Sequence, residues 1–170
     1  MNRTQVVEQL PGLRRYARAL TGDAWAADDL VQDTLERACR KWRLWRRDSD
    51  LRAWLFTLMH NLYLNQRRGL VAVQMVDAEG LASLPGADGI VGDTAMDLDR
   101  CLQRLPAEQR AVLLLVTLED MAYADVARVL DIPVGTVMSR LSRARSRMRE
   151  LLEPASGIPT RSPAALRRMK

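Results

Sequence analysis

The stretch Tyr123–Leu152 reads YADVARVLDIPVGTVMSRLSRARSRMRELL, and its pattern decides the fold of the C-terminal part of the chain. A short helical segment, Tyr123–Leu130, is followed by the tight connection Asp131-Ile132-Pro133. A longer helical segment, Val134–Leu152, follows that connection. Two helices joined by so short a turn are typical of a helix-turn-helix, whose second helix enters the major groove of DNA.

The second of these helices has two different faces when its residues are placed at about 100° apart. One stripe is apolar and is expected to pack on the preceding helices: Val134, Val137, Leu141, Ala144, Met148 and Leu152. The opposite stripe holds Thr136, Ser139, Arg140, Arg143 and Arg147. Arginine binds phosphate or grips a guanine edge with two hydrogen bonds, so this stripe is predicted to bind duplex DNA. A solvated basic surface is the alternative for such a helix taken alone.

Working outward, the rest of the chain predicts an all-α protein of two small helical domains. Helices are expected from about residue 4 to 20, with an interior break or kink at Pro11-Gly12, and from an Asp23 cap to about 45. A third is expected from 51 to about 68, with Ser49 or Asp50 as its cap. The N-terminal domain therefore spans residues 1–68. The Gly-, Pro- and acid-containing stretch 69–93 is predicted to be a flexible acidic linker. Residues 94–152 form the second domain, and 153–170 a mobile basic tail.

The helix predicted after Asp23 divides into an apolar and an acidic side. The apolar side holds Leu30, Val31, Thr34, Leu35, Ala38 and Trp42. The other side holds Asp29, Gln32, Asp33 and Glu36, with Asp28 at the boundary. Acidic side chains repel DNA phosphates, so this stripe is either a solvated surface or a docking face for a basic protein partner.

The helix predicted over 51–68 carries aromatic and basic residues on one side. Its core stripe is Leu51, Leu55, Leu58 and Leu62, and the other side holds Arg52, Phe56, His60, Tyr63 and Arg67. Aromatic rings beside cations give stacking surfaces for unpaired bases next to charges for the nucleic-acid backbone. The alternative is that Phe56 and Tyr63 pack internally, against Trp42, Trp45 or the first helix.

Composition and motifs argue against several functional classes. The net charge of +5 and a pI near 9.9 make a polyanion a plausible partner. No glycine-rich phosphate loop, HExxH motif or useful histidine–cysteine pairing occurs, so we expect no catalytic residues, no metal and no cofactor, and an enzyme is not predicted. Two distant cysteines predict free thiols rather than a disulfide framework. Without a secretory signal or an apolar run near 18 residues, no membrane insertion and a cytoplasmic location are expected.

Taken in order, these segments resemble the extracytoplasmic-function (group IV) sigma factors of the sigma-70 family. The residues Ala27-Asp-Asp-Leu-Val-Gln-Asp-Thr-Leu-Glu-Arg-Ala38 resemble the region of that family that binds core RNA polymerase. The stretch Leu51–Arg68 resembles the regions that open and read the promoter −10 element. The segments Leu105–Leu115 and Tyr123–Arg147 resemble region 4, which reads the −35 element.

The resemblance implies a role for each of these surfaces. Core polymerase would be bound by Asp28, Asp29, Leu30, Gln32, Asp33 and Glu36. The −10 element would be held by Arg43, Arg46, Arg52, Phe56, His60, Asn61, Tyr63 and Arg67. The −35 element would lie against Thr136, Ser139, Arg140, Arg143 and Arg147. The implied partners are core polymerase, promoter DNA and an anti-sigma factor.

The sequence departs from the family pattern at four positions. Ala122 stands where a serine cap is frequent, which weakens the start of the short helix by about 1 kcal/mol. Asp131 replaces a usual turn glycine, so the sequence does not fix the turn geometry. Met138 replaces a frequent lysine and Asn65 a frequent aspartate, which predicts atypical promoter contacts.

Two other functions are compatible with parts of the sequence. A dimeric helix-turn-helix regulator uses the C-terminal motif but leaves the acidic and aromatic-basic helices unexplained. A helical adaptor that binds acidic proteins uses the basic charge alone. Transcription initiation uses all three surfaces.

Overall fold

The computed structural model describes residues 3–45, 50–76 and 93–152, and every regular element in these ranges is helical. The N-terminal half contains α1 (Arg3–Thr21), α2 (Ala24–Lys41), the short 3-10 helix η1 (Trp42–Leu44) and α3 (Leu51–Val76). The C-terminal half contains α4 (Asp93–Gln103), α5 (Ala107–Thr117), α6 (Tyr123–Leu130) and α7 (Val134–Leu152). The expected all-α architecture is confirmed.

Local signals set the junction between α1 and α2 as the sequence predicts. Gly22 ends α1 with a φ of 74°, a backbone conformation that costs glycine little. Asp23 caps α2, because its Oδ1 accepts a hydrogen bond of 2.8 Å from the backbone N–H of Ala26. Pro11 does not break α1, which continues as one helix through the proline.

The third helix is longer than the sequence predicted. Asp50 stands at its start, with Oδ1 accepting a hydrogen bond of 2.9 Å from the backbone N–H of Arg52. The helix then continues past the expected end at Arg68 to Val76. A single interior glycine such as Gly69 costs a helix only about 1 kcal/mol, and residues 70–76 contain no proline. The predicted linker therefore begins inside a helix, and its residues 77–92, like the predicted tail 153–170, lie outside the described residues.

The helix-turn-helix has the predicted bounds, and the structure supplies the turn geometry. Asp131 adopts the left-handed conformation (φ 53°, ψ 51°) at the C-terminal end of α6, and its N–H bonds to the carbonyl of Ala127. Ile132 donates to the same carbonyl at 3.0 Å. At the other end of α6, Ala122 gives no side-chain cap, as its side chain implies.

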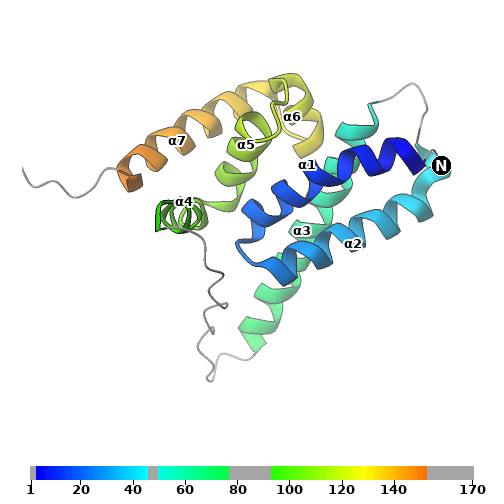
Figure 1. Cartoon of the computed structure of the whole chain (residues 1–170). Coiled ribbons are helices and arrows are strands. Elements are labelled where there is room, and N and C mark those ends of the chain that lie inside the picture. The colour runs from blue at the N-terminus through cyan, green and yellow to red at the C-terminus, as the bar shows by residue number, and fades with distance from the viewer. Residues whose placement is uncertain (1–2, 46–49, 77–92, 153–170) are drawn as a thin grey trace, which may run out of the picture.

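The two halves pack together through one continuous hydrophobic core. Helix α3 lies against α6, and α1 lies against α4 and α5 (Figure 1). Core residues from both halves, such as Leu13 and Phe56 on one side and Leu115 and Val126 on the other, are fully buried. The described helices of the two predicted domains thus pack against each other, with α1 and α3 of the N-terminal half on α4, α5 and α6, and this packing is called the closed arrangement below.

Candidate functional site

The exposed face of α7 carries the residues predicted to bind duplex DNA. Val137, Leu141, Ala144 and Met148 are buried, which turns the opposite stripe outward. Arg143, Arg147 and Ser139 are exposed. The Oγ of Ser139 donates 3.1 Å to the carbonyl of Thr136. Two members of the predicted apolar stripe, Val134 and Leu152, are exposed because they lie at the helix ends, beyond the contact with the core.

Arg140 differs from the other arginines of this stripe. Its guanidinium lies 2.6 Å from the Glu108 carboxylate of α5, and its side chain is only 24% exposed. Arg143 and Arg147 are exposed, so they are the arginines of this stripe best placed to contact a phosphate or a base edge.

The acidic face of α2 is exposed, with two exceptions. Asp28, Asp29, Gln32 and Glu36 are exposed, and Glu36 lies 3.4 Å from Arg40. Asp33 is half-buried and accepts a hydrogen bond of 3.2 Å from Gln66 of α3. Leu30 is completely buried, so its expected contact with a partner is wrong: its side chain belongs to the core under the acidic face.

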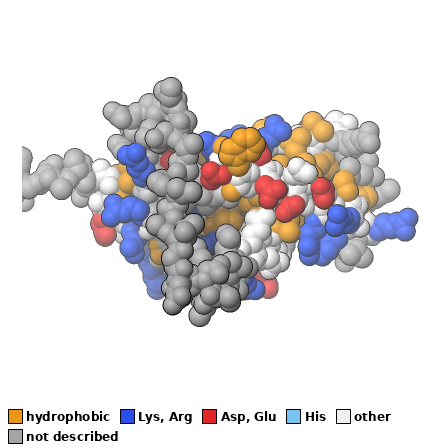
Figure 2. Space-filling view, turned by 90° about the horizontal axis from the view of Figure 1, so that it is seen from below, with side chains coloured by type: hydrophobic (Ala, Val, Ile, Leu, Met, Phe, Trp, Pro, Cys, Tyr) orange, Lys and Arg blue, Asp and Glu red, His pale blue; other side chains and the backbone are white. Residues whose placement is uncertain are grey.

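An open groove adjoins this acidic face and gives a partner both charge and apolar contact. Its walls come from α1 and α2, with these lining residues: Arg14, Asp28, Val31, Gln32, Leu35, Glu36, Cys39 and Arg40. Figure 2, seen from below Figure 1, shows acidic and hydrophobic side chains beside one another on that face. A mixed surface of this kind fits a docking site better than a uniformly solvated helix does.

The expected exposed stacking face on α3 is absent from the closed arrangement. Phe56 is fully buried and packs edge-on against Tyr16 of α1, with ring centroids 5.3 Å apart. His60 and Tyr63 are also buried, and the Tyr63 hydroxyl lies 3.3 Å from a guanidinium nitrogen of Arg110 on α5. Helical spacing separated the aromatic-basic side of α3 from its leucine stripe. It did not reveal that the C-terminal half covers part of it.

The other residues expected to bind the −10 element fall into three groups. Arg43, Asn61 and Arg67 are exposed, and Arg67 lies over the Tyr63 ring at 5.9 Å. Arg52 is half-exposed and is bound by Glu119 of the C-terminal half. Arg46 lies outside the described residues.

The environment of His60 keeps its imidazole neutral. Burial, and to a smaller extent the positive charge of Arg140, together lower the pKa of His60 to about 4. Its Nδ1 has no hydrogen-bond partner among the described residues. The contact between the halves therefore disfavours a proton on this ring.

Three functional features were not predicted from the sequence. Trp42, Trp45 and Trp54 form a cluster with ring centroids 4.9 to 6.4 Å apart, which ties η1 to the start of α3. Arg15 and Glu119 meet between the halves, and Arg110 lies buried beside Tyr63. The close spacing of the three tryptophans in the sequence could have indicated the first feature. Nothing in the sequence around Glu119 indicates that it binds Arg15 and Arg52, which lie far from it along the chain.

Within the described parts of the chain, no group of three or more histidine, cysteine or acidic residues is arranged to hold a metal. None of the helices there is long and apolar enough to cross a membrane.

Known families match both halves. Residues 6–60 match the model of the Sigma2 domain of PhyR, and residues 95–148 match Sigma-70, region 4. The first match covers the acidic helix and the start of α3, and the second covers the helix-turn-helix. The comparison therefore assigns the two halves to the regions that the sequence motifs predicted.

Single curated relatives match across both halves of this chain. The ECF RNA polymerase sigma factor EcfG of Rhodopseudomonas palustris is 37% identical over 154 residues, which cover 88% of this chain and 84% of the relative. SigM of Mycobacterium tuberculosis, also an ECF RNA polymerase sigma factor, is 35% identical over 82% of this chain and 71% of its own.

A solved structure extends the likeness to three dimensions. The sigma factor RpoE from Bartonella quintana, in complex with the anti-sigma factor NepR, superposes with a TM-score of 0.78 and 34% identity. The match covers 89% of this chain and 96% of that one. The likeness in sequence and structure covers the acidic helix, the helix-turn-helix and their relative order, and it shows that this chain belongs to the ECF family of RNA polymerase sigma factors.

Proposed function

We propose that this sigma factor directs core polymerase to its promoters through three separate surfaces. The acidic face of α2, made of Asp28, Asp29, Gln32, Asp33 and Glu36, binds core polymerase. The observation that carries the proposal is the exposure of this face and of the α7 arginines on different helices of one small chain. One protein can then hold the enzyme and the DNA at the same time.

The C-terminal half reads the duplex −35 element. Arg143 and Arg147 are exposed on α7 and contact base edges or phosphates in the major groove, with Thr136 and Ser139 near the helix start. Arg140 joins this surface after it leaves Glu108. These contacts fix the position of the complex on the promoter.

The N-terminal half holds the −10 element after the strands separate. Arg43, Asn61 and Arg67 are exposed on or near α3 and reach the strand directly. Arg52, His60 and Tyr63 become available when the C-terminal half moves away, whereas Phe56 stays in the core beside Tyr16. Binding unpaired bases offsets the cost of unstacking, which is a few kcal/mol per step.

This function is binding and not catalysis, and it is exerted in the cytoplasm, where core polymerase and promoter DNA meet. An anti-sigma partner holds the chain inactive, by analogy with the RpoE relative that was crystallised with NepR. Addition of a purified partner of that class is expected to suppress transcription by this chain.

Run-off transcription tests the proposal directly. Sigma-free core polymerase, the purified chain and fragments of genomic DNA are expected to give transcripts with discrete starts, and each component omitted in turn gives none. A chain that binds duplex DNA tightly without polymerase, and never supports initiation, would instead be a conventional regulator.

A further inference from the structure

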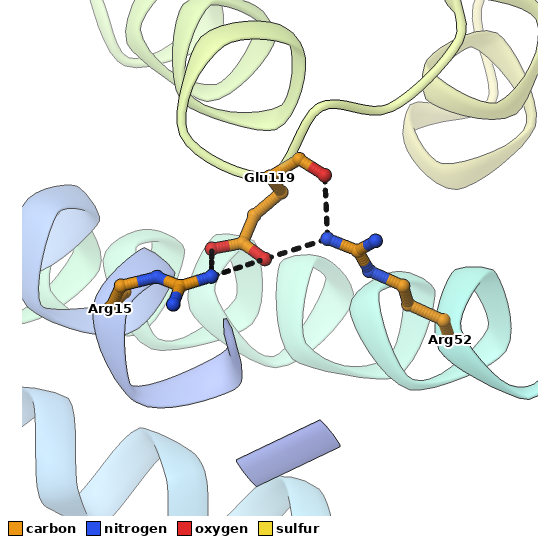
Figure 3. Close-up of polar contacts among 3 residues, drawn as sticks. All are labelled: Arg15, Arg52 and Glu119. Carbon is orange, nitrogen blue, oxygen red and sulfur yellow. Dashed lines mark hydrogen bonds and ion pairs between the residues drawn. The ribbon is translucent and has the colours of Figure 1, made fainter. Parts of the chain in front are cut away.

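Glu119 joins the two halves at a single buried carboxylate. It lies in the connection between α5 and α6, and its side chain is completely buried. Arg15 of α1 lies 3.3 and 3.4 Å from its two carboxylate oxygens. Arg52 of α3 donates 2.9 Å to Oε2 and 2.5 Å to the backbone carbonyl of the same residue (Figure 3). The contact thus links α1 and α3 to the C-terminal half.

The backbone around this carboxylate leaves it little freedom. A Cβ added at Gly12 would lie 2.7 Å from Oε2, so α1 approaches the carboxylate where it has no side chain. Asp120, the next residue, has a φ of 50°, which turns the chain sharply after Glu119. The carboxylate is therefore held between the two arginines by its surroundings.

The two arginines are not themselves buried. The Arg15 side chain is 56% exposed and that of Arg52 is 38% exposed, although the carboxylate between them has no exposure. Guanidinium groups bind phosphates with the same planar hydrogen-bonding geometry that they use for carboxylates. Arg15 and Arg52 thus form a cradle that holds one anionic group between them, while the two arginine side chains remain reachable from solvent.

The occupied cradle lies on a surface assigned above to the −10 strand. Arg52 begins the side of α3 that continues with His60 and Tyr63, and both of these residues are buried in the closed arrangement. The Tyr63 hydroxyl faces Arg110, and His60 lies close to Arg140, both from the C-terminal half. The movement that removes Glu119 from the cradle would also uncover these side chains.

We propose that Arg15 and Arg52 form a binding site for a backbone phosphate of the single-stranded −10 DNA, and that Glu119 occupies this site in the closed arrangement as an internal competitor. The inference rests on the proposed function and adds Arg15, a new DNA-binding residue, and Glu119, a new inhibitory one. The free chain then binds single-stranded DNA weakly, because only the fraction with an empty cradle is competent.

The test uses the full chain and a short single-stranded oligonucleotide, with binding followed by fluorescence anisotropy at low salt. Glu119→Gln keeps the size of the side chain but removes its charge, and we expect it to tighten binding about tenfold by raising the competent fraction. Glu150→Gln on α7 removes the same charge from an exposed site and is expected to leave binding within about twofold of the unaltered chain. The gain of Glu119→Gln should shrink as salt is added.

A double variant distinguishes a phosphate site at Arg15 and Arg52 from a gain in affinity caused only by exposure of the rest of α3. Adding Arg15→Ala to Glu119→Gln is expected to abolish most of the tenfold gain, because Arg15 contributes half of the cradle. Should the double variant bind as tightly as Glu119→Gln, the cradle is refuted. Should Glu119→Gln fail to fold, Glu119→Asp, which draws the carboxylate back from the arginines by one methylene group, is tested in the same way, and it too is expected to bind the oligonucleotide more tightly than the unaltered chain.

The result is independent of the broader proposal. If run-off transcription succeeds while Glu119→Gln binds single-stranded DNA no better than Glu150→Gln, the inference is wrong and the sigma function stands. If transcription fails with every promoter while the Glu119 variant gains affinity in the Arg15-dependent way, the cradle stands and the proposed function is wrong.

Discussion

His60 is the single histidine of the chain, and its ring lies buried on α3 within the electrostatic reach of Arg140 on α7. Helical spacing placed this residue with the aromatic-basic side of α3. Its burial was beyond sequence reasoning, because the atoms that surround it come from helices much later in the chain. His60 was expected to bind DNA, and its pKa is also sensitive to the contact between the halves.

The pH dependence of stability follows from the lowered pKa of His60. The unfolded chain takes up a proton near the ordinary pKa of 6.5, whereas the folded chain does so only near pH 4. The free energy of unfolding should therefore be constant above about pH 6.5 and should fall by about 3 kcal/mol as the pH drops to about 4. Urea unfolding across this range measures the change.

Replacing the ring isolates its share of that pH dependence. His60→Gln keeps a polar side chain that does not titrate. The decrease in the free energy of unfolding between pH 6.5 and 4 should therefore be about 3 kcal/mol smaller in this variant than in the unaltered chain. Identical curves for the two proteins would show that His60 is not the group responsible.

The bounds of helix α6 were predicted correctly from the sequence, but its N-terminus lacks a capping side chain. Its bounds, Tyr123–Leu130, are those predicted, and Ala122 has the extended backbone of a helix cap (φ −62°, ψ 147°) without a capping side chain. Ala122→Ser should stabilise the chain by about 1 kcal/mol, because the hydroxyl accepts a backbone N–H that has no intrahelical partner. Thermal and urea unfolding would record the gain. Ala124→Ser, at an exposed position inside the same helix, should give none.

Helix α2 is expected to determine affinity for polymerase without affecting the fold. Asp28→Arg with Glu36→Arg reverses two exposed charges and should weaken core-polymerase binding at least about tenfold. Asp99→Arg on α4 reverses an exposed charge elsewhere and serves as the control. Co-purification and titration with labelled polymerase measure the effect. Unimpaired binding of the double variant would remove the docking role of α2.

Helix α7 is expected to determine affinity for duplex promoter DNA. Arg143→Ala should cost about 1–3 kcal/mol of specific binding if Arg143 grips a base edge, or should reduce the salt slope by about one if it binds a phosphate. Arg18→Ala on α1 is the matched control for loss of an exposed arginine. Titrations with duplex DNA at several salt concentrations distinguish these cases, and an unchanged affinity and slope would exclude Arg143 from the interface.

At the scale of the elements, sequence patterns predicted most of the architecture. The Asp23 cap and the helix-turn-helix bounds follow from local rules and are confirmed, as are the four inner residues of the buried stripe of α7. The end of α3 was misplaced because Gly69 was given more weight than its helix penalty warrants. The two sides of α2 were predicted correctly, since Leu30 is buried on the apolar side and Asp28, Asp29, Gln32 and Glu36 are exposed on the other. The burial of Leu30 disagrees only with its expected contact with polymerase.

At the scale of the whole molecule, the closed arrangement depends on contacts that local periodicity does not encode. Glu119 meets Arg52 across 67 positions of sequence and Arg15 across 104. The sequence predicted two domains and their separate tasks, but not that the C-terminal half would cover part of the side of α3 that was expected to bind DNA. Under the proposed function, binding of the −10 strand by the buried residues His60 and Tyr63 is expected to need separation of the halves, whereas duplex binding by α7 is not.

Different helices of this chain are proposed to hold the enzyme and the DNA, and a ternary-complex assay can separate their roles. Polymerase, labelled promoter DNA and the chain are combined, and each pairwise complex is measured alongside the ternary one. The Asp28→Arg/Glu36→Arg chain should keep its duplex binding and fail to bring polymerase, whereas the Arg143→Ala chain should keep polymerase and lose the promoter. If both variants lose the same partner, or neither loses any, the proposed division between α2 and α7 is contradicted.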